Sequence, residues 1–271
     1  MEPFYLGGTG SPMVMLHGFT DTWRTWKPVL PALEAHHTVF APSLPGHLGG
    51  ESFAPDSPFT ISASLDLVER QLDARGIGQA HLVGNSLGGW GALELAGRGR
   101  ALSVVAICPG GGYEHGGAEE RAVLRYFRNN ERMLRLRASK ALLPRIARSP
   151  ALRRVAFRDL MARPHNVGEA DALAFFEGAL GCEVFRDAIA VSESGEAYGE
   201  LGPIDCPVRI LYGTRDRIIR WPTHYRRLKR LLPTAEYLPL HGLGHLPMWD
   251  DPETVVRRIL EISAPKTSAA A

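Results

Sequence analysis

Short apolar runs alternate with helical patterns along the first part of the chain, and this alternation limits the possible folds more than any other feature. The runs are residues 13–16, 38–41, 81–83 and 103–107. Continuous apolar runs of this length are typical of strands buried on both faces. The stretch 61–75 between two of them carries apolar residues three or four positions apart, as an amphipathic helix does. We therefore expect an α/β fold with a mostly parallel sheet and helices on both faces.

The alternation stops after Gly112 and resumes at Val208. The residues between them read as helices, first an Arg-rich part and then an apolar helical stripe from Phe175 to Ile189. Strand-like runs at 208–212 and 235–238 and helical patterns at 225–232 and 251–262 follow. We expect a core domain made of residues 1–112 and 204–271, interrupted by a helical cap, or lid, of residues 113–203.

The charge of the chain is concentrated in the first part of this cap. Residues 113–163 hold 12 Arg and one Lys against four Glu and one Asp, a net charge of +8, whereas the whole chain carries +2. The arginines at 121, 125, 128, 132 and 135 follow helical spacing and form one stripe. The stripe has three interpretations: a solvated helix face, attraction of an anionic substrate such as an acyl-CoA or a carboxylated ester, or a membrane or nucleic-acid surface. We favour the solvated face and expect no nucleic-acid partner.

Composition narrows the remaining classes. No apolar stretch is long enough to span a membrane, and the first residues lack a signal-peptide pattern, so we expect a cytoplasmic protein. The three cysteines, Cys108, Cys182 and Cys206, are too few for a disulfide framework and read as buried or partly buried thiols. No metal-ligand spacing or phosphate-binding loop is visible, so we expect neither a metal nor a cofactor. The sequence leaves an oligomer possible.

The segment Gly84-Asn85-Ser86-Leu87-Gly88 follows a strand-like run and precedes a helical one. Such a G-x-S-x-G segment forms a tight strand-to-helix turn, and the glycines on either side prevent clashes. The serine then lies at a helix N-terminus, where negative charge is stabilised. Ser86 is therefore the candidate nucleophile.

A serine hydroxyl needs an adjacent base. His245 lies in a glycine-containing loop between the last strand and the last helix, where catalytic side chains of open parallel sheets gather. His241 is the competing candidate, and we prefer His245 because His241 directly follows the strand.

A third residue should orient the imidazole. Asp216 lies just past the strand-like run 208–212, whereas Asp205 precedes that run and would lie at the opposite edge of the sheet. Asp250 and Asp251 read as residues of a helix N-terminus.

Two N–H groups should stabilise an oxyanion. The Leu87 N–H follows the nucleophile, and the Phe19 N–H lies in the turn after the first apolar run. Five further residues are the candidate substrate-binding lining: Trp23, Phe175, Phe176, Phe185 and Leu246.

These motifs resemble those of the α/β-hydrolase superfamily from Pro12 to about Ile262. The matching segments are His17-Gly18-Phe19, the Pro-Gly-His turn at 45–47, the serine turn at 84–89, Asp216 in Gly-Thr-Arg-Asp, and Gly244-His245. The resemblance implies the α/β-hydrolase fold with an inserted helical lid and a triad in the chain order Ser86, Asp216, His245. It also implies that the first β-hairpin of the family is shortened here to residues 4–6.

The resemblance leaves several activities open. The serine at position 86 sets aside haloalkane dehalogenases and epoxide hydrolases, because those relatives use aspartate there. The leading hypothesis is a serine hydrolase that cleaves a carboxylic ester, thioester or lactone with an apolar acyl group or an anionic ester as its small-molecule substrate. One alternative is a carbon–carbon bond hydrolase of the meta-cleavage type, although Leu246 stands where those enzymes commonly carry Trp. The other is a ligand-binding protein that keeps the fold without catalysis.

Overall fold

The computed structural model describes residues 2–54, 56 and 58–264, and only the backbone of 137–141. Seven strands form one sheet in the order β1-β3-β2-β4-β5-β6-β7. All neighbours are parallel except β1, which pairs antiparallel to β3. The strands are β1 (Phe4–Gly7), β2 (Ser11–Leu16), β3 (His37–Pro42), β4 (Ala80–Asn85), β5 (Ala101–Ile107), β6 (Val208–Gly213) and β7 (Glu236–Leu240). Every strand-like run expected from the sequence is a strand in this sheet.

Alternate side chains of the inner strands enter two separate cores, because successive residues of a strand point to opposite faces. In β2, Val14 and Leu16 belong to one core, and Met13 and Met15 belong to the other. Both cores exclude water from these strands, which explains why the strands read as continuous apolar runs.

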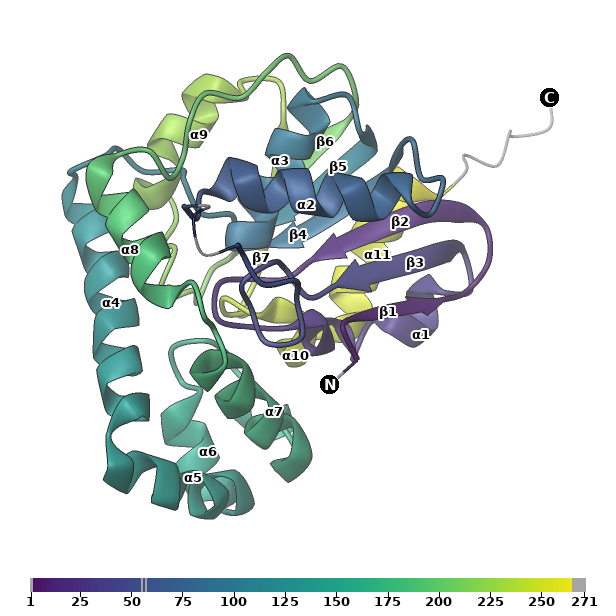
Figure 1. Ribbon diagram of the computed structural model, residues 1–271. Helices are drawn as coiled ribbons and strands as arrows, with labels where there is room; N and C mark the ends of the chain where they lie inside the picture. The colour runs from purple at the N-terminus through teal and green to yellow at the C-terminus, as the bar shows by residue number, and fades with distance from the viewer. Residues whose placement is uncertain (1, 55, 57, 265–271) are drawn as a thin grey trace.

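Helices cover both faces of the sheet (Figure 1). Helices α2 (Ile61–Asp73), α3 (Leu87–Gly97) and α9 (Arg226–Leu231) lie over one face, and α1 (Leu30–Leu33), α10 (Pro247–Asp250) and α11 (Pro252–Ser263) lie over the other. Thr60 begins α2 by accepting a hydrogen bond from Ala63 N, and Asp251 begins α11 by accepting one from Thr254 N. The predicted α/β architecture is present.

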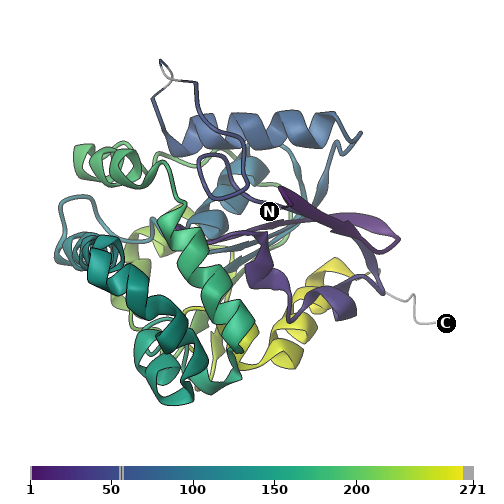
Figure 2. The ribbon, with the colours of Figure 1, turned by 60° about the horizontal axis from the view of Figure 1, so that its bottom comes forward.

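Residues 113–203, which we call the insert, connect β5 to β6. Figures 1 and 2 show its helices gathered beside one end of the sheet. They are α4 (Ala118–Arg135), α5 (Arg137–Arg148), α6 (Pro150–Ala156), α7 (Glu169–Leu180) and α8 (Phe185–Ser194). The apolar stripe expected from Phe175 to Ile189 is divided between α7 and α8. Among the described residues, no helix is both long enough and apolar enough to cross a membrane.

Candidate active site

Ser86 lies at the sharp turn between β4 and α3, with φ 54° and ψ −115°. This backbone conformation is strained for a residue that has a side chain. The flanking glycines make the turn possible: a Cβ on Gly84 would lie 2.0 Å from Gly88 O, and a Cβ on Gly88 would lie 2.1 Å from Leu16 O. The turn therefore presents the Ser86 side chain at the start of α3, as the G-x-S-x-G spacing predicts.

His245 and Asp216 come from two loops at the same end of the sheet. His245 Nδ1 donates a hydrogen bond of 2.7 Å to Asp216 Oδ2, and both side chains are almost wholly buried. The other oxygen, Asp216 Oδ1, accepts hydrogen bonds from Ile218 N at 2.7 Å and Ile219 N at 2.9 Å. The carboxylate is thus held on both oxygens and fixes the imidazole with Nδ1 protonated. His241 and Asp205, the competing candidates, are exposed.

The turn after β2 lies directly against the serine turn. A Cβ on Gly18 would lie 3.3 Å from Ser86 Cβ. His17 holds this turn, because its Nδ1 donates to Gly18 O at 2.8 Å and its Nε2 accepts from Leu44 N at 2.7 Å. Within the described residues, the N–H groups of Phe19 and Leu87 donate to no protein acceptor. Two uncommitted N–H groups near a serine are what an oxyanion hole requires.

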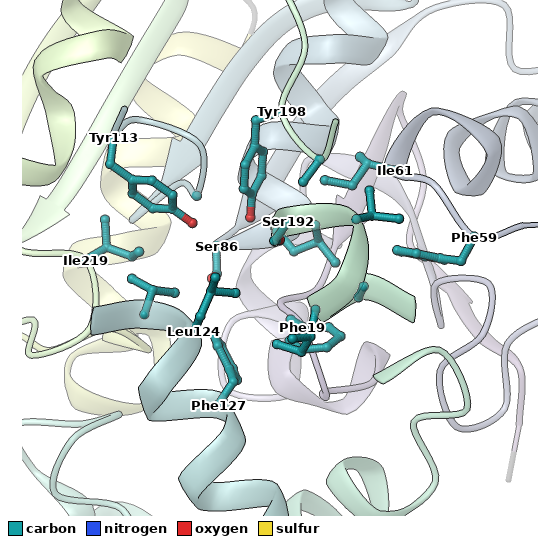
Figure 3. Close-up of a pocket in the computed structure, with 17 residues that line it drawn as sticks. Phe19, Phe59, Ile61, Ser86, Tyr113, Leu124, Phe127, Ser192, Tyr198 and Ile219 are labelled. Carbon is teal, nitrogen blue, oxygen red and sulfur yellow. The ribbon is translucent and has the colours of Figure 1, made fainter. Parts of the chain in front are cut away.

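A cavity of about 480 Å³ lies between the sheet and the insert, and both Ser86 and His245 line it. Four residues expected at the substrate are also in its wall: Phe175, Phe176, Phe185 and Leu246. A second cavity of about 40 Å³ adjoins Ser86, and Leu87 lines it (Figure 3). Phe19 lines both cavities.

The sequence model of the alpha/beta hydrolase family matches residues 13–258 of the chain. The chain belongs to this family. It is similar to an epoxide hydrolase of Mycobacterium tuberculosis, with 32% identity over 195 residues that cover 72% of this chain and 90% of the relative. The aligned region thus covers most of both proteins.

Solved structures share the fold of this alpha/beta hydrolase at low identity. A thermophilic esterase from Thermogutta terrifontis superposes with a TM-score of 0.68 and 21% identity, over 95% of this chain and 91% of the other. The 2-hydroxy-6-oxo-6-phenylhexa-2,4-dienoate hydrolase of a Rhodococcus species gives a TM-score of 0.71 and 21% identity, over 95% and 92%. At this identity the likeness shows the fold alone.

Trp23 was expected in the substrate-binding lining, and that expectation is wrong. Its indole N–H donates to Glu2 O at 2.9 Å, and its ring lies 5.5 Å from the Tyr5 ring. Trp23 does not contribute to the wall of either cavity at Ser86. The 3-10 turn Trp23–Trp26 directs it toward the N-terminal strand instead.

Asp250 was interpreted as a helix-start residue, and that interpretation is also wrong. Its Oδ2 accepts from Gly244 N at 2.7 Å and Ala162 N at 3.0 Å, and its Oδ1 accepts from Arg163 N at 2.6 Å. Asp251 alone has the predicted capping role. No local pattern marks Asp250, because two of its partners lie more than 80 residues away in the chain.

Asn85 is a second positioning residue that the sequence analysis did not single out. Its Nδ2 donates to Ile107 O at 3.1 Å and to His245 O at 3.0 Å. The residue next to the nucleophile therefore holds the main chain of the histidine loop. Its position inside the G-x-S-x-G segment was the available signal.

Cys108 completes a buried group with Asp216 and His245, whose potential ligand atoms all lie within 4.8 Å of one another. Burial, followed by the nearby Asp216 charge, raises the pKa of the Cys108 thiol well above its ordinary value. The imidazole and carboxylate are already joined at 2.7 Å, so this donor set does not fit a metal ion.

Three buried groups near the nucleophile have shifted pKa values. Burial raises the pKa of Asp21, which lines the large cavity, to about 7. Burial lowers the pKa of His47 to about 4, and it lowers that of neighbouring His17 well below the ordinary value. Asp21 therefore gains its charge near neutral pH, and the two histidines are neutral there.

The arginine stripe lies on the exposed side of α4. Arg128 pairs with Glu193, Arg135 pairs with Glu131, and Arg121 donates to Gly116 O. None of the five stripe arginines lines either cavity at Ser86. The stripe thus has the properties of a solvated helix face.

Proposed function

We propose that this alpha/beta hydrolase is a serine hydrolase that cleaves carboxylic esters, with thioesters and lactones as related substrates. The hydrogen bond from His245 to Asp216, at a cavity that the strained Ser86 shares, carries the proposal. A carboxylate held by two backbone N–H groups stabilises the imidazolium that forms during catalysis. A binding protein that had lost catalysis would have no need of this arrangement.

In the proposed reaction Ser86 Oγ attacks the ester carbonyl carbon while its proton passes to His245 Nε2. The N–H groups of Phe19 and Leu87 donate to the oxyanion that forms. When the ester C–O bond breaks, the proton on Nε2 passes to the leaving alcohol oxygen. Water then attacks the acyl-enzyme carbonyl with the same base, and the acid and free Ser86 are released.

The carbon–carbon alternative requires a place for the carboxylate of a dienoate. Among the described residues, no Lys or Arg lines the small cavity. Arg158 lines the large cavity, but its side chain is exposed to solvent and lies 3.9 Å from the Asp159 carboxylate. A carboxylate buried without a cationic partner is strongly disfavoured. Ester cleavage is therefore the better supported reaction of the same three side chains.

A fluorophosphonate probe tests the proposal, because it phosphonylates only an activated serine. We expect wild-type protein to be labelled, and Ser86→Ala and His245→Ala to be unlabelled while remaining folded by circular dichroism. Ser86→Ala should lower kcat for an ester by roughly 10⁶-fold. A Ser86→Ala variant retaining a tenth of the activity, or turnover of an epoxide or a dienoate with esters inert, would contradict the proposal.

A further inference from the structure

Two cavities of very different size meet at Ser86. The large cavity measures about 480 Å³ and the small one about 40 Å³. Ser86, Phe19 and Phe127 line both, so a substrate bound at the serine can enter each of them. An ester has two substituents, one on the carbonyl carbon and one on the ester oxygen, and each must occupy one side.

His245 distinguishes the two sides. It lines the large cavity and does not contribute to the wall of the small one. In the proposed reaction His245 gives its proton to the oxygen of the leaving alcohol, which must lie within hydrogen-bond reach of the imidazole. The alcohol part therefore belongs in the large cavity, and the acyl chain belongs in the small one.

The small cavity sets a limit on the acyl chain. A water molecule needs about 10–15 Å³ of such space, so 40 Å³ holds a chain of about three non-hydrogen atoms. Part of its wall is Tyr198, which packs directly on the main chain of Gly110 and Gly111. The packing leaves no room for side chains at these two positions, because an added Cβ would lie 2.8 Å from the Tyr198 hydroxyl at Gly110 and 2.7 Å from the Tyr198 ring at Gly111. Ile189 of α8 and Leu124 of α4, both buried, close the other side.

The same cavity is uncharged but not wholly apolar. The rings of Tyr113 and Tyr198 lie edge to face 5.9 Å apart, and both hydroxyls point toward Ser86 (Figure 3). Burial raises the pKa of both phenols, so they are neutral at physiological pH. Each phenol carries one O–H group, which can donate to an oxygen on the acyl chain.

We propose, building on the ester hydrolysis proposed above, that the substrates are esters of short acyl groups with bulky apolar alcohols. The acyl chain has up to about three non-hydrogen atoms beyond the carbonyl, and it accepts a hydroxyl but no charge. The alcohol occupies the large cavity, whose wall includes Leu134, Leu143, Phe175 and Phe176. The bond that breaks joins the short acyl carbon to the oxygen of the large alcohol.

Two isomeric esters test this orientation directly. Octyl acetate and ethyl octanoate have the same atoms, with the long chain on the alcohol in one and on the acid in the other. We expect kcat/KM for octyl acetate to exceed that for ethyl octanoate by at least about tenfold, because a pocket that cannot hold added methylenes discriminates against them. Equal values, or a preference for ethyl octanoate, would overturn the assignment.

A matched pair of variants locates the limit in the small cavity. Ile189 lines only the small cavity and Ile146 only the large one. We expect Ile189→Ala to raise the ratio of kcat/KM for p-nitrophenyl hexanoate, whose acyl chain exceeds the limit, over p-nitrophenyl acetate by about tenfold, and Ile146→Ala to leave that ratio unchanged. If Ile189→Ala does not fold, Ile189→Val should raise the ratio by a smaller factor. A larger change of the ratio in Ile146→Ala would overturn the assignment.

Fluorophosphonate labelling separates failure of this inference from failure of the proposed function. Protein that is labelled at Ser86 and cleaves long-chain acyl esters best would keep the serine hydrolase and reject the short acyl group. Labelled protein that cleaves neither isomer also rejects it. Protein that is neither labelled nor active on any ester would reject both.

Discussion

The carboxylate of Asp250 binds the main-chain N–H of Gly244, the residue directly before His245, at 2.7 Å. The same carboxylate binds two N–H groups of the insert, at Ala162 and Arg163. One buried side chain, 2% exposed, therefore fixes the histidine loop and the insert relative to each other.

Replacing Asp250 should disturb both stability and catalysis. In Asp250→Asn one carboxylate oxygen becomes an NH₂ group, which leaves at least one of the three N–H groups without its present acceptor. We expect the free energy of unfolding to fall by about 1–3 kcal/mol and kcat/KM to fall at least about tenfold as the histidine loop shifts. Urea unfolding and ester kinetics measure the two effects. Asp251→Asn, which keeps a capping oxygen, is the matched control, and equal effects in the two variants would reject the role of Asp250.

The Asp216 carboxylate should matter for rate far more than for binding. In Asp216→Asn the amide can present an N–H to the imidazole and favour the wrong tautomer, so we expect kcat to fall by roughly 10⁴-fold with KM little changed. Labelling by fluorophosphonate should slow in parallel. Asp205→Asn, at an exposed position before β6, should have wild-type kinetics. Retention of more than a tenth of kcat in Asp216→Asn would remove Asp216 from the triad.

Asp21 and His47 should have opposite effects on stability as pH changes. The pKa of Asp21 is raised from 3.8 to about 7, so the folded chain binds more protons there, and this stabilisation is lost as pH rises from about 4 to 7. The pKa of His47 is lowered from 6.5 to about 4, so its contribution is full above pH 6.5 and is lost as pH falls toward 4. In the wild-type protein the two contributions oppose each other between about pH 4 and 6.5.

Asp21→Asn should remove the Asp21 contribution to the pH dependence of stability and leave that of His47. The amide is uncharged at every pH, as the protonated Asp21 carboxyl is at low pH. The free energy of unfolding of the variant should therefore equal that of wild type at pH 4 and exceed it at pH 8 by up to about 4 kcal/mol. Urea unfolding across this range measures the difference. Asp205→Asn is the exposed control and should follow the wild-type curve. An Asp21→Asn variant that is less stable than wild type at pH 8 would show that the carboxylate is ionised and well paired in the fold.

Tyr198 should select acyl groups that carry a hydroxyl. Tyr198→Phe removes one O–H from the wall of the small cavity and keeps the ring that packs on Gly110 and Gly111. We expect kcat/KM for a hydroxyacetyl ester to fall by about tenfold relative to the acetyl ester of the same alcohol. Tyr237→Phe, whose hydroxyl donates to Leu232 O away from both cavities, should leave the ratio unchanged. A fall of the same size for both esters would mean that the hydroxyl acts on structure and does not select the acyl group.

The strands and the three candidate catalytic residues could be located from the sequence because their signals are local. Val14 and Leu82 lie in continuous apolar runs, and Ser86 lies between glycines that its own turn requires. Asp216 and His245 follow strands, and parallel strands bring their carboxyl ends to one edge. Chain order and strand position were enough to place these residues together.

The errors concern residues whose roles depend on distant partners. Trp23 follows the turn after β2 in sequence, but the 3-10 turn directs its ring toward Tyr5. Asp250 precedes a helix, yet its partners Ala162 and Arg163 belong to the insert. The small cavity could not be foreseen either, because Tyr198 reaches Gly110 from 88 positions along the chain.

The attachment of the insert limits how the large cavity can open. Besides the bonds to Asp250, Leu246 N donates to Leu160 O at 2.8 Å and Asn166 Nδ2 donates to Trp249 O at 2.8 Å. The insert is thus anchored at its middle as well as at its two chain ends. A hinge rotation of the whole insert would break all of these bonds at once and would displace His245 with them. Movement confined to α4, which lies N-terminal to these bonds in the chain, would break none of them and would leave His245 in place.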